Sequence, residues 1–248
     1  MKKQQPINRR KAIVAGLTSL GGLMLSGCFK KNLPPTYGNI LRMGDAFTYF
    51  AQRKLLPGQS LVKEYQPSDI SSFPATGTTN PADPKSPYYS KAYGPLQSNN
   101  FADWCLSIEG SVARPGSYSL ADLKKLPSRT QITRHTCEEG WSAIGEWTGV
   151  PLSVILNNAG VLPNARFVNF YGYDAYFDSI DMIDALHPQT ILAYGMNGSD
   201  LSVPHGAPLR LRVETQIGYK SVKYLQRITV TDKFVDPGDT GWSWYTGI

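Results

Sequence analysis

The dipeptide Asn197-Gly198 stands between two short apolar runs, residues 192–196 and 201–203. Asn-Gly favours the two-residue turn of a β-hairpin, because both residues tolerate the positive φ angles that such a turn requires. Two apolar runs joined by this turn are typical of paired antiparallel strands. The C-terminal half of the chain is therefore predicted to contain a β-hairpin rather than a helical bundle.

Further strands are predicted on both sides of this hairpin. Apolar and polar residues alternate, as in half-buried strands, over residues 103–109, 131–136, 166–171, 208–213 and 222–230. Between them, residues 151–159 favour a helix, and Gly160 suits its C-terminal cap. The pattern predicts an α+β fold with a mixed, irregular sheet and a few helices.

Residues 67–100 predict a long irregular excursion. They are rich in Gly, Ser, Thr and Asn, and prolines recur at Pro74, Pro81, Pro84, Pro87 and Pro95. Loops of this length within a compact domain are usually functional or disordered, and composition leaves both readings open.

The amino end predicts export. Arg9-Arg10 precedes an apolar stretch over residues 12–25, which is too short for a comfortable membrane span but suits a cleaved signal. A twin arginine is typical of the pathway that exports folded proteins. The flanks depart from the usual twin-arginine pattern, so export in the unfolded state remains an alternative.

The run LSGC at residues 25–28 resembles a lipoprotein cleavage box, which would leave Cys28 as a lipidated first residue. The alternative is a soluble secreted protein in which Cys28 is incidental. We therefore expect residues 1–27 to be the signal, 28–59 a tether with a short helix over 41–55, and 60–248 one globular domain.

Charge argues against nucleic acid as a partner. The formal net charge is +6, but five positive charges lie in the predicted signal with no acid beside them, which leaves the rest of the chain near +1. Nucleic-acid binding requires clustered basic faces.

Cys137 is a candidate functional residue, because its thiol could bind a metal or act as a nucleophile. A thiolate binds transition metals well, and cations such as Arg134 and a protonated His135 would lower its pKa. Four interpretations of Cys137 remain. It could be a buried apolar residue, half of a disulfide with Cys105, a nucleophile with His135 as its base, or a metal ligand. A disulfide would occupy the thiol that a metal needs.

Several sequence motifs, which follow one another in a fixed order, favour the interpretation of Cys137 as a metal ligand. Cys137 opens CEEGWS at residues 137–142, and the motifs that follow are WTGVPL at 147–152, ALHPQT at 185–190, YGMNG at 194–198, HGAPLR at 205–210 and GYKSVK at 218–223. This order, over residues 100–231, resembles the molybdenum domain of the sulfite oxidase family. It is most similar to the bacterial branch that includes periplasmic methionine sulfoxide reductases.

The resemblance implies a sulfite-oxidase-type molybdopterin-binding domain that holds a molybdenum-molybdopterin cofactor. It makes Cys137 the protein ligand to molybdenum and the catalytic centre. The residues that would hold the pterin and its phosphate are His205, Arg210, Ser221, Val222 and Lys223. For Arg210 and Lys223 the alternative is the solvated face of an ordinary strand.

The resemblance also implies two-electron oxygen-atom transfer. Sulfite is a poor candidate, because residues 73–77 lack the arginine with which sulfite-oxidising members hold the anion. Gly172 stands where the reductase branch has a hydroxyl residue, so the pocket differs from theirs. A sulfoxide or a related small S- or N-oxide is expected, with Tyr171, Asp174 and Tyr176 as candidate substrate residues.

Electrons would come from a separate partner, because no Cys-x-x-Cys-His haem motif is present. The resemblance implies a membrane b-type cytochrome. A periplasmic enzyme attached through a lipid on Cys28 is expected, as a monomer, since no immunoglobulin-like dimerisation domain follows residue 231. The alternative is a lipid-anchored binding protein that keeps the fold without turnover.

Overall fold

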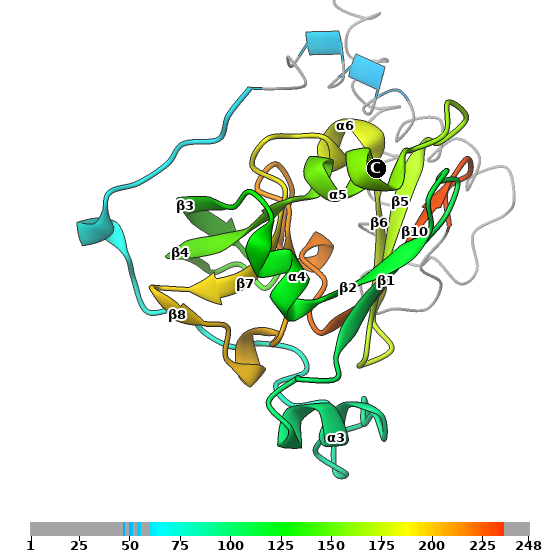
Figure 1. The fold of residues 1–248 in the computed structure, drawn as a ribbon. Coiled ribbons are helices and arrows are strands. Elements are labelled where there is room, and N and C mark those ends of the chain that lie inside the picture. Colours follow the sequence, from blue (N-terminus) through cyan, green and yellow to red (C-terminus); the bar gives the residue numbers. More distant parts are fainter. Residues whose placement is uncertain (1–46, 48–49, 52–53, 56–59, 236–248) are drawn as a thin grey trace, which may run out of the picture. The chain divides into compact units, whose positions relative to one another are not determined.

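The computed structural model describes residues 47, 50, 51, 54, 55 and 60–235 (Figure 1). The predicted signal and Cys28 lie outside the described residues. Of the helix expected over residues 41–55, the five described positions are all helical. Contacts divide the chain into two units, Met1–Gln52 and Arg53–Ile248, and the fold below is that of the second.

Two five-stranded sheets form this unit, which confirms the predicted α+β class. The first sheet has the order β2-β1-β10-β5-β6, in which β1 and β10 are parallel and the other neighbours antiparallel. Its strands are β1 (Cys105–Gly110), β2 (Gly116–Ser119), β5 (Phe167–Gly172), β6 (Phe177–Asp181) and β10 (Leu225–Thr231).

The second sheet is antiparallel and has the order β3-β4-β7-β8, with β9 also paired to β7. Its strands are β3 (Arg129–Thr136), β4 (Ser142–Pro151), β7 (Ile191–Met196), β8 (Ser199–Asp200) and β9 (Arg210–Arg212). Figure 1 shows this sheet beside the first one.

Short helices precede the first strand or connect later ones. They are α3 (Tyr93–Ser98), α4 (Leu120–Lys125), α5 (Leu152–Ala159) and α6 (Met182–Ala185). Gly160 ends α5 at φ 68° in the left-handed region, as predicted. Ser119 caps α4, because its hydroxyl accepts from the backbone N–H of Asp122. In the part of the chain that the structure describes, no helix is long and apolar enough to cross a membrane.

The main core lies where the two sheets and α5 meet. It contains Trp104, Phe170 and Leu211, all fully buried. A smaller cluster around Trp147 lies on the second sheet, and Phe73 from the irregular segment packs against it. Burial of these large side chains supplies the main driving force for the fold.

Two strand predictions needed correction, and three strands were not predicted. Residues 201–203 are not a strand: β8 ends at Asp200, and Val203 begins a 3-10 helix, Val203–His205, that contains Pro204, which has no N–H to donate to a sheet. Strand β10 starts at Leu225 instead of residue 222, because Tyr224 has a positive φ of 54°. No sequence pattern predicted strands β2, β4 and β6.

The irregular segment is largely as expected. Residues 67–100 contain only the 3-10 helix Pro67–Asp69 and α3, with turns elsewhere. Its residues 73–78 reach the cavity described next.

Candidate active site

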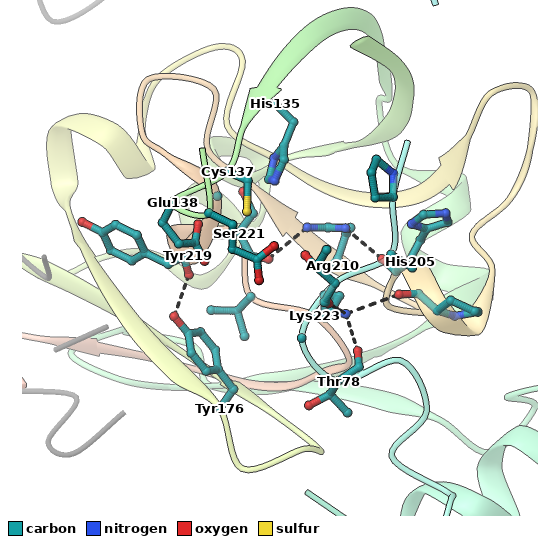
Figure 2. Close-up of a pocket in the computed structure, with 18 of the residues that line it drawn as sticks. Thr78, His135, Cys137, Glu138, Tyr176, His205, Arg210, Tyr219, Ser221 and Lys223 are labelled. Atoms are coloured by element: carbon teal, nitrogen blue, oxygen red, sulfur yellow. Dashed lines mark hydrogen bonds between the residues drawn. The ribbon is translucent and has the colours of Figure 1, made fainter. Parts of the chain in front are cut away.

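A cavity of about 420 Å³ opens between segments that are distant in the sequence (Figure 2). Its lining comes from residues 73–78, from the turn after β3, from the loop after β5, from the stretch around His205 and β9, and from residues 218–223. All six residues predicted to bind the cofactor line it: Cys137, His205, Arg210, Ser221, Val222 and Lys223.

Cys137 follows the last residue of β3 and lies in a tight turn that leads into β4. Its N–H donates to the carbonyl of Trp141 at 2.9 Å, and the N–H of Gly140 donates to the Cys137 carbonyl at 3.1 Å. Gly140 has φ 91°, a conformation that favours glycine. The turn places a thiol that is only 6% exposed in the cavity wall.

Burial raises the pKa of the Cys137 thiol, and the neighbouring carboxylates of Glu138 and Glu139 raise it further. Without a metal the group is therefore a neutral thiol and a poor nucleophile. Bound to a transition metal, a thiol is deprotonated. Both cysteines among the described residues are free, Cys105 exposed and Cys137 buried, so the disulfide alternative is not formed.

His135 lies two residues before Cys137 and is neutral. Its Nδ1 is 2.6 Å from Nη1 of Arg212, and since a guanidinium can only donate, the imidazole accepts. Burial, then Arg212 and Arg210, lower the pKa of His135 to about 2. A ring with so little basicity is unsuited to deprotonating the thiol, which argues against the nucleophile reading.

Arg210 begins β9 and is 5% exposed. Its Nη1 donates to the carbonyl of His205 at 3.0 Å and its Nη2 to that of Ser221 at 3.2 Å. Its Nε is buried and has no hydrogen-bond partner in the described structure. Burial and repulsion from Arg212 lower the pKa of Arg210 to about 9. The solvated-strand alternative does not hold for this residue.

Lys223 is the second cation in the wall. Its Nζ donates to the carbonyls of Thr76 at 2.8 Å and Pro204 at 3.3 Å, and it also contacts the carbonyl of Thr78. Burial and repulsion from Arg210 lower the pKa of Lys223 to about 7, against an opposing effect from Asp174. A buried and a half-buried cation in one wall favour an anionic ligand.

Two of the three candidate substrate residues lie at the cavity. Asp174 and Tyr176 line it, and the Tyr176 hydroxyl donates to the carbonyl of Tyr219 at 2.9 Å. Tyr171 does not line the cavity. Its ring stacks on that of Phe177, with 5.4 Å between the ring centres, and the Arg227 guanidinium lies over it, 4.0 Å from its centre. In β5 its side chain points away from the face that buries Phe170.

Several lining residues escaped the sequence analysis. Glu138 has a buried Oε2 with no hydrogen-bond partner among the described residues. Its position next to Cys137 in the sequence could have predicted that it lines the site. Phe73 packs against His135, Trp141 and His205 at centroid distances of 5.2, 5.9 and 5.7 Å. No local pattern marks Phe73, because its neighbours in space are distant in sequence.

The ALHPQT motif lies away from the cavity lining. His187 Nε2 is 3.1 Å from the carbonyl of Ser60, and the Gln189 amide binds the backbone of Val62 in both directions. This motif holds the start of the described domain against the second sheet.

The fold and the site together define a class: a two-sheet domain whose cavity offers a buried thiol, a buried arginine and a half-buried lysine to an anionic cofactor. Residues 93–237 match the family model described as oxidoreductase molybdopterin binding domain, which is more than half of the chain. The protein belongs to this family and is a molybdopterin-dependent oxidoreductase.

Curated relatives agree over most of the length. The chain is 35% identical to the putative protein-methionine-sulfoxide reductase subunit YedZ1 of Azospira oryzae, over 96% of this chain and 87% of the relative. It is 30% identical to the protein-methionine-sulfoxide reductase catalytic subunit MsrP of Xanthomonas axonopodis pv. citri, over 94% and 72%.

Among solved structures, the fold is similar to that of the sulfane dehydrogenase SoxCD from Paracoccus pantotrophus. The TM-score is 0.51 and the identity 29%, and the match covers 53% of this chain and 39% of that chain.

The residues present fit a molybdenum-pterin cofactor. No three His, Cys, Asp or Glu side chains within the described ranges gather as metal ligands, so a metal at Cys137 needs its other ligands from a cofactor. Unpaired buried atoms at Arg210 Nε and Glu138 Oε2 offer a donor and an acceptor. Gly218 lets the backbone of the cavity wall pack closely against His135, since a Cβ there would lie 2.7 Å from His135 Nε2.

Proposed function

We propose that this chain is an exported molybdenum enzyme that reduces a sulfoxide by two-electron oxygen-atom transfer. The balanced reaction takes one sulfoxide, two electrons and two protons to one thioether and one water. One observation carries the proposal: the thiol of Cys137 shares a single cavity with all five other residues expected to hold the pterin.

In this proposal each residue has a role that its contacts support. Cys137 is the ligand to molybdenum, and its turn orients the sulfur into the cavity. Arg210 and His205 provide donors for the pterin and its phosphate, and Ser221, Val222 and Lys223 form the wall beside them. The cofactor, when bound, supplies the two-electron redox chemistry, and the protein supplies orientation, electrostatics and access.

A neutral sulfoxide suits the entrance better than sulfite. The aromatic rings of Phe73, Trp141, Tyr176 and Tyr219 line the cavity, and aromatic surfaces make favourable contacts with the sulfur of a thioether. No arginine occurs in residues 73–78 to hold an anion. The relatives' name, protein-methionine-sulfoxide reductase, points to methionine sulfoxide as the substrate. Asp174 and Tyr176 are the candidate substrate contacts.

The enzyme would act outside the cytoplasm, attached to a membrane. Arg9-Arg10 and the LSGC run favour export to the periplasm and attachment through a lipid on Cys28. A membrane b-type cytochrome would supply the two electrons, and the enzyme would act as a monomer.

The test is metal content. The full chain is expressed in a host that makes the cofactor, with Cys137→Ser as the variant and Cys105→Ser as the matched control. We expect about one molybdenum per chain in the wild type and in Cys105→Ser, since one thiolate binds one metal, and a large loss in Cys137→Ser. Methionine sulfoxide reduction with a reduced viologen dye should follow the metal. A folded, metal-free wild type would support the binding-protein alternative instead.

A further inference from the structure

The imidazole of His135 is held at its Nδ1 edge by a buried network. Nη1 of Arg212 lies 2.6 Å from Nδ1, and since a guanidinium can only donate, Nδ1 accepts. Arg212 is itself fixed, because Glu214 binds its Nε at 3.1 Å and its Nη2 at 2.9 Å, and its guanidinium lies 4.4 Å from the centre of the Trp147 ring. The network therefore decides which ring nitrogen of His135 accepts.

The other ring nitrogen of His135 must carry the proton. In a neutral imidazole one nitrogen accepts and the other donates, so an accepting Nδ1 leaves the N–H at Nε2. A second proton at Nδ1 would point at the donors of Arg212, which keeps the ring neutral. No group in the described part of the chain accepts a hydrogen bond from Nε2. His135 therefore presents an N–H donor that the protein itself does not use.

This donor belongs to the cavity wall. His135 lines the cavity together with Cys137, and Figure 2 shows its ring reaching inward on the side of that cysteine. Phe73 and Trp141 pack against the imidazole, with ring centres 5.2 and 5.6 Å away. A donor fixed from several sides needs no reorganisation when an acceptor arrives.

A rival acceptor stands close to this donor. A Cβ on Gly218 would lie 2.7 Å from His135 Nε2 and 3.0 Å from Oε2 of Glu138, so both atoms face the same strip of backbone. Oε2 of Glu138 is buried and has no hydrogen-bond partner among the described residues. The two groups are thus neighbours that do not bind each other, and the His135 donor stays available to a ligand.

We propose that His135 donates through Nε2 to the oxygen of a bound sulfoxide, and that Arg212 is the positioning residue that holds the imidazole in this tautomer. The inference rests on the proposed function and adds a contact to it. When the S–O bond breaks, the sulfur is reduced and the oxygen leaves as water, with two electrons and two protons from outside the site. A fixed donor stabilises the negative charge that grows on this oxygen, and the imidazole keeps its own proton.

The experiment uses the molybdenum-loaded full chain in four forms: wild type, His135→Asn, His135→Gln and His187→Asn. The side-chain oxygen of Asn can stand where Nδ1 stands in histidine, so His135→Asn keeps an acceptor for Arg212 and loses the cavity donor. The longer Gln can place its amide N–H near the position of Nε2. His187→Asn is the matched control, because Nε2 of His187 lies 3.1 Å from the Ser60 carbonyl, away from the cavity lining.

We expect His135→Asn to lower kcat for methionine sulfoxide by about 100-fold, as on losing a donor to a developing oxyanion. KM should change by less than about threefold, because the contact strengthens in the transition state. His135→Gln should recover at least about tenfold of the lost kcat, and His187→Asn should stay within about twofold of the wild type. Molybdenum per chain should be the same in all four proteins.

Nuclear magnetic resonance of ¹⁵N-labelled histidine tests the tautomer and the contact directly. The chain has three histidines, so the variants assign the signals of His135 and His187. We expect a protonated Nε2 and an unprotonated Nδ1 in His135. In the oxidised enzyme methionine sulfoxide can bind without being reduced. It should then move the Nε2–H proton resonance of His135 downfield and leave that of His187 in place.

Several results would overturn the proposal. A proton on Nδ1 of His135 would remove the donor, and a wild-type kcat in fully loaded His135→Asn would remove its role. A loss of molybdenum in His135→Asn as large as in Cys137→Ser would assign His135 to cofactor binding. A downfield Nε2–H resonance that is present before substrate is added, and absent in Glu138→Gln, would make Glu138 the acceptor.

Should His135→Asn fail to fold, the wild-type resonances with and without methionine sulfoxide still decide. An Nε2–H resonance that does not move in loaded wild type ends the contact alone. A wild type that binds no molybdenum ends the proposed function and the sulfoxide contact together, so the two failures are distinguishable.

Discussion

Arg212 and His135 share a hydrogen bond in which Nη1 lies 2.6 Å from Nδ1. The same guanidinium also binds Glu214 with two nitrogens, Nε to Oε1 at 3.1 Å and Nη2 to Oε2 at 2.9 Å. One buried arginine therefore fixes both the orientation of the imidazole beside Cys137 and the position of a buried carboxylate.

Removing Arg212 should strongly destabilise the fold. Both side chains of the Arg212–Glu214 pair are 1% exposed, and Arg212→Met would leave a buried charge unpaired. We expect a loss of about 3–5 kcal/mol in the free energy of unfolding. Urea denaturation followed by tryptophan fluorescence measures it.

The control for Arg212→Met is Lys124→Gln, which breaks the Lys124–Asp200 ion pair at 2.8 Å on the surface. This pair is exposed, so its loss should cost below about 1 kcal/mol. If both variants lowered the free energy of unfolding by the same amount, burial of the Arg212–Glu214 pair would not explain the effect.

A methyl group at Gly218 should displace two side chains of the cavity wall, those of His135 and Glu138. Its Cβ would lie 2.7 Å from His135 Nε2 and 3.0 Å from Glu138 Oε2. Gly218→Ala is therefore expected to lower molybdenum content and to destabilise the fold by about 1–3 kcal/mol. Gly116→Ala is the control, because nothing lies within 4 Å of a Cβ there. Full metal loading of Gly218→Ala would show that cofactor binding does not depend on the placement of these two side chains.

The stability of the protein should depend on pH through Asp174. Burial raises the pKa of this carboxyl above its usual range, although hydrogen bonds from the Tyr176 N–H and the Thr78 side chain, and the charge of Lys223, oppose the change. The folded state then holds a proton that the unfolded state has lost. This contribution to stability is full below the usual pKa of 3.8 and disappears as pH rises through the raised value.

Asp174→Asn removes this titration. Relative to the wild type, the variant should lose less stability as pH rises through that window, in urea unfolding curves recorded across the acid to neutral range. Parallel curves for the two proteins would show that Asp174 does not titrate anomalously.

The two described cysteines should react with iodoacetamide at different rates. In metal-free protein at neutral pH, Cys105 is exposed and Cys137 buried with a raised thiol pKa. Peptide mapping should find Cys137 labelled at least about ten times more slowly. After denaturation both should label fully without a reductant. Protection of both cysteines in the denatured chain would instead indicate a disulfide.

Local features were predictable because short stretches determine them. Gly160 ends α5 and the Asn197-Gly198 turn joins β7 to β8, with φ angles of 50° and 75°, because few residues other than glycine and asparagine adopt these conformations readily. Strand β4 was missed although it is ten residues long: it contains Gly145 and Gly149, and its burial alternates only against partners that the sequence does not reveal.

The order of residues along the chain was enough to identify the reactive groups and the family: a cysteine in CEEGWS, followed by the HGAPLR and GYKSVK motifs. The contacts between these groups became known from the folded domain alone. Lys223 lies against the carbonyls of Thr76 and Thr78, about 145 residues earlier, and Arg210 keeps an unpaired Nε. A cation's role depends on which acceptors surround it, and contacts at that separation are set by packing of the whole fold rather than by local pattern.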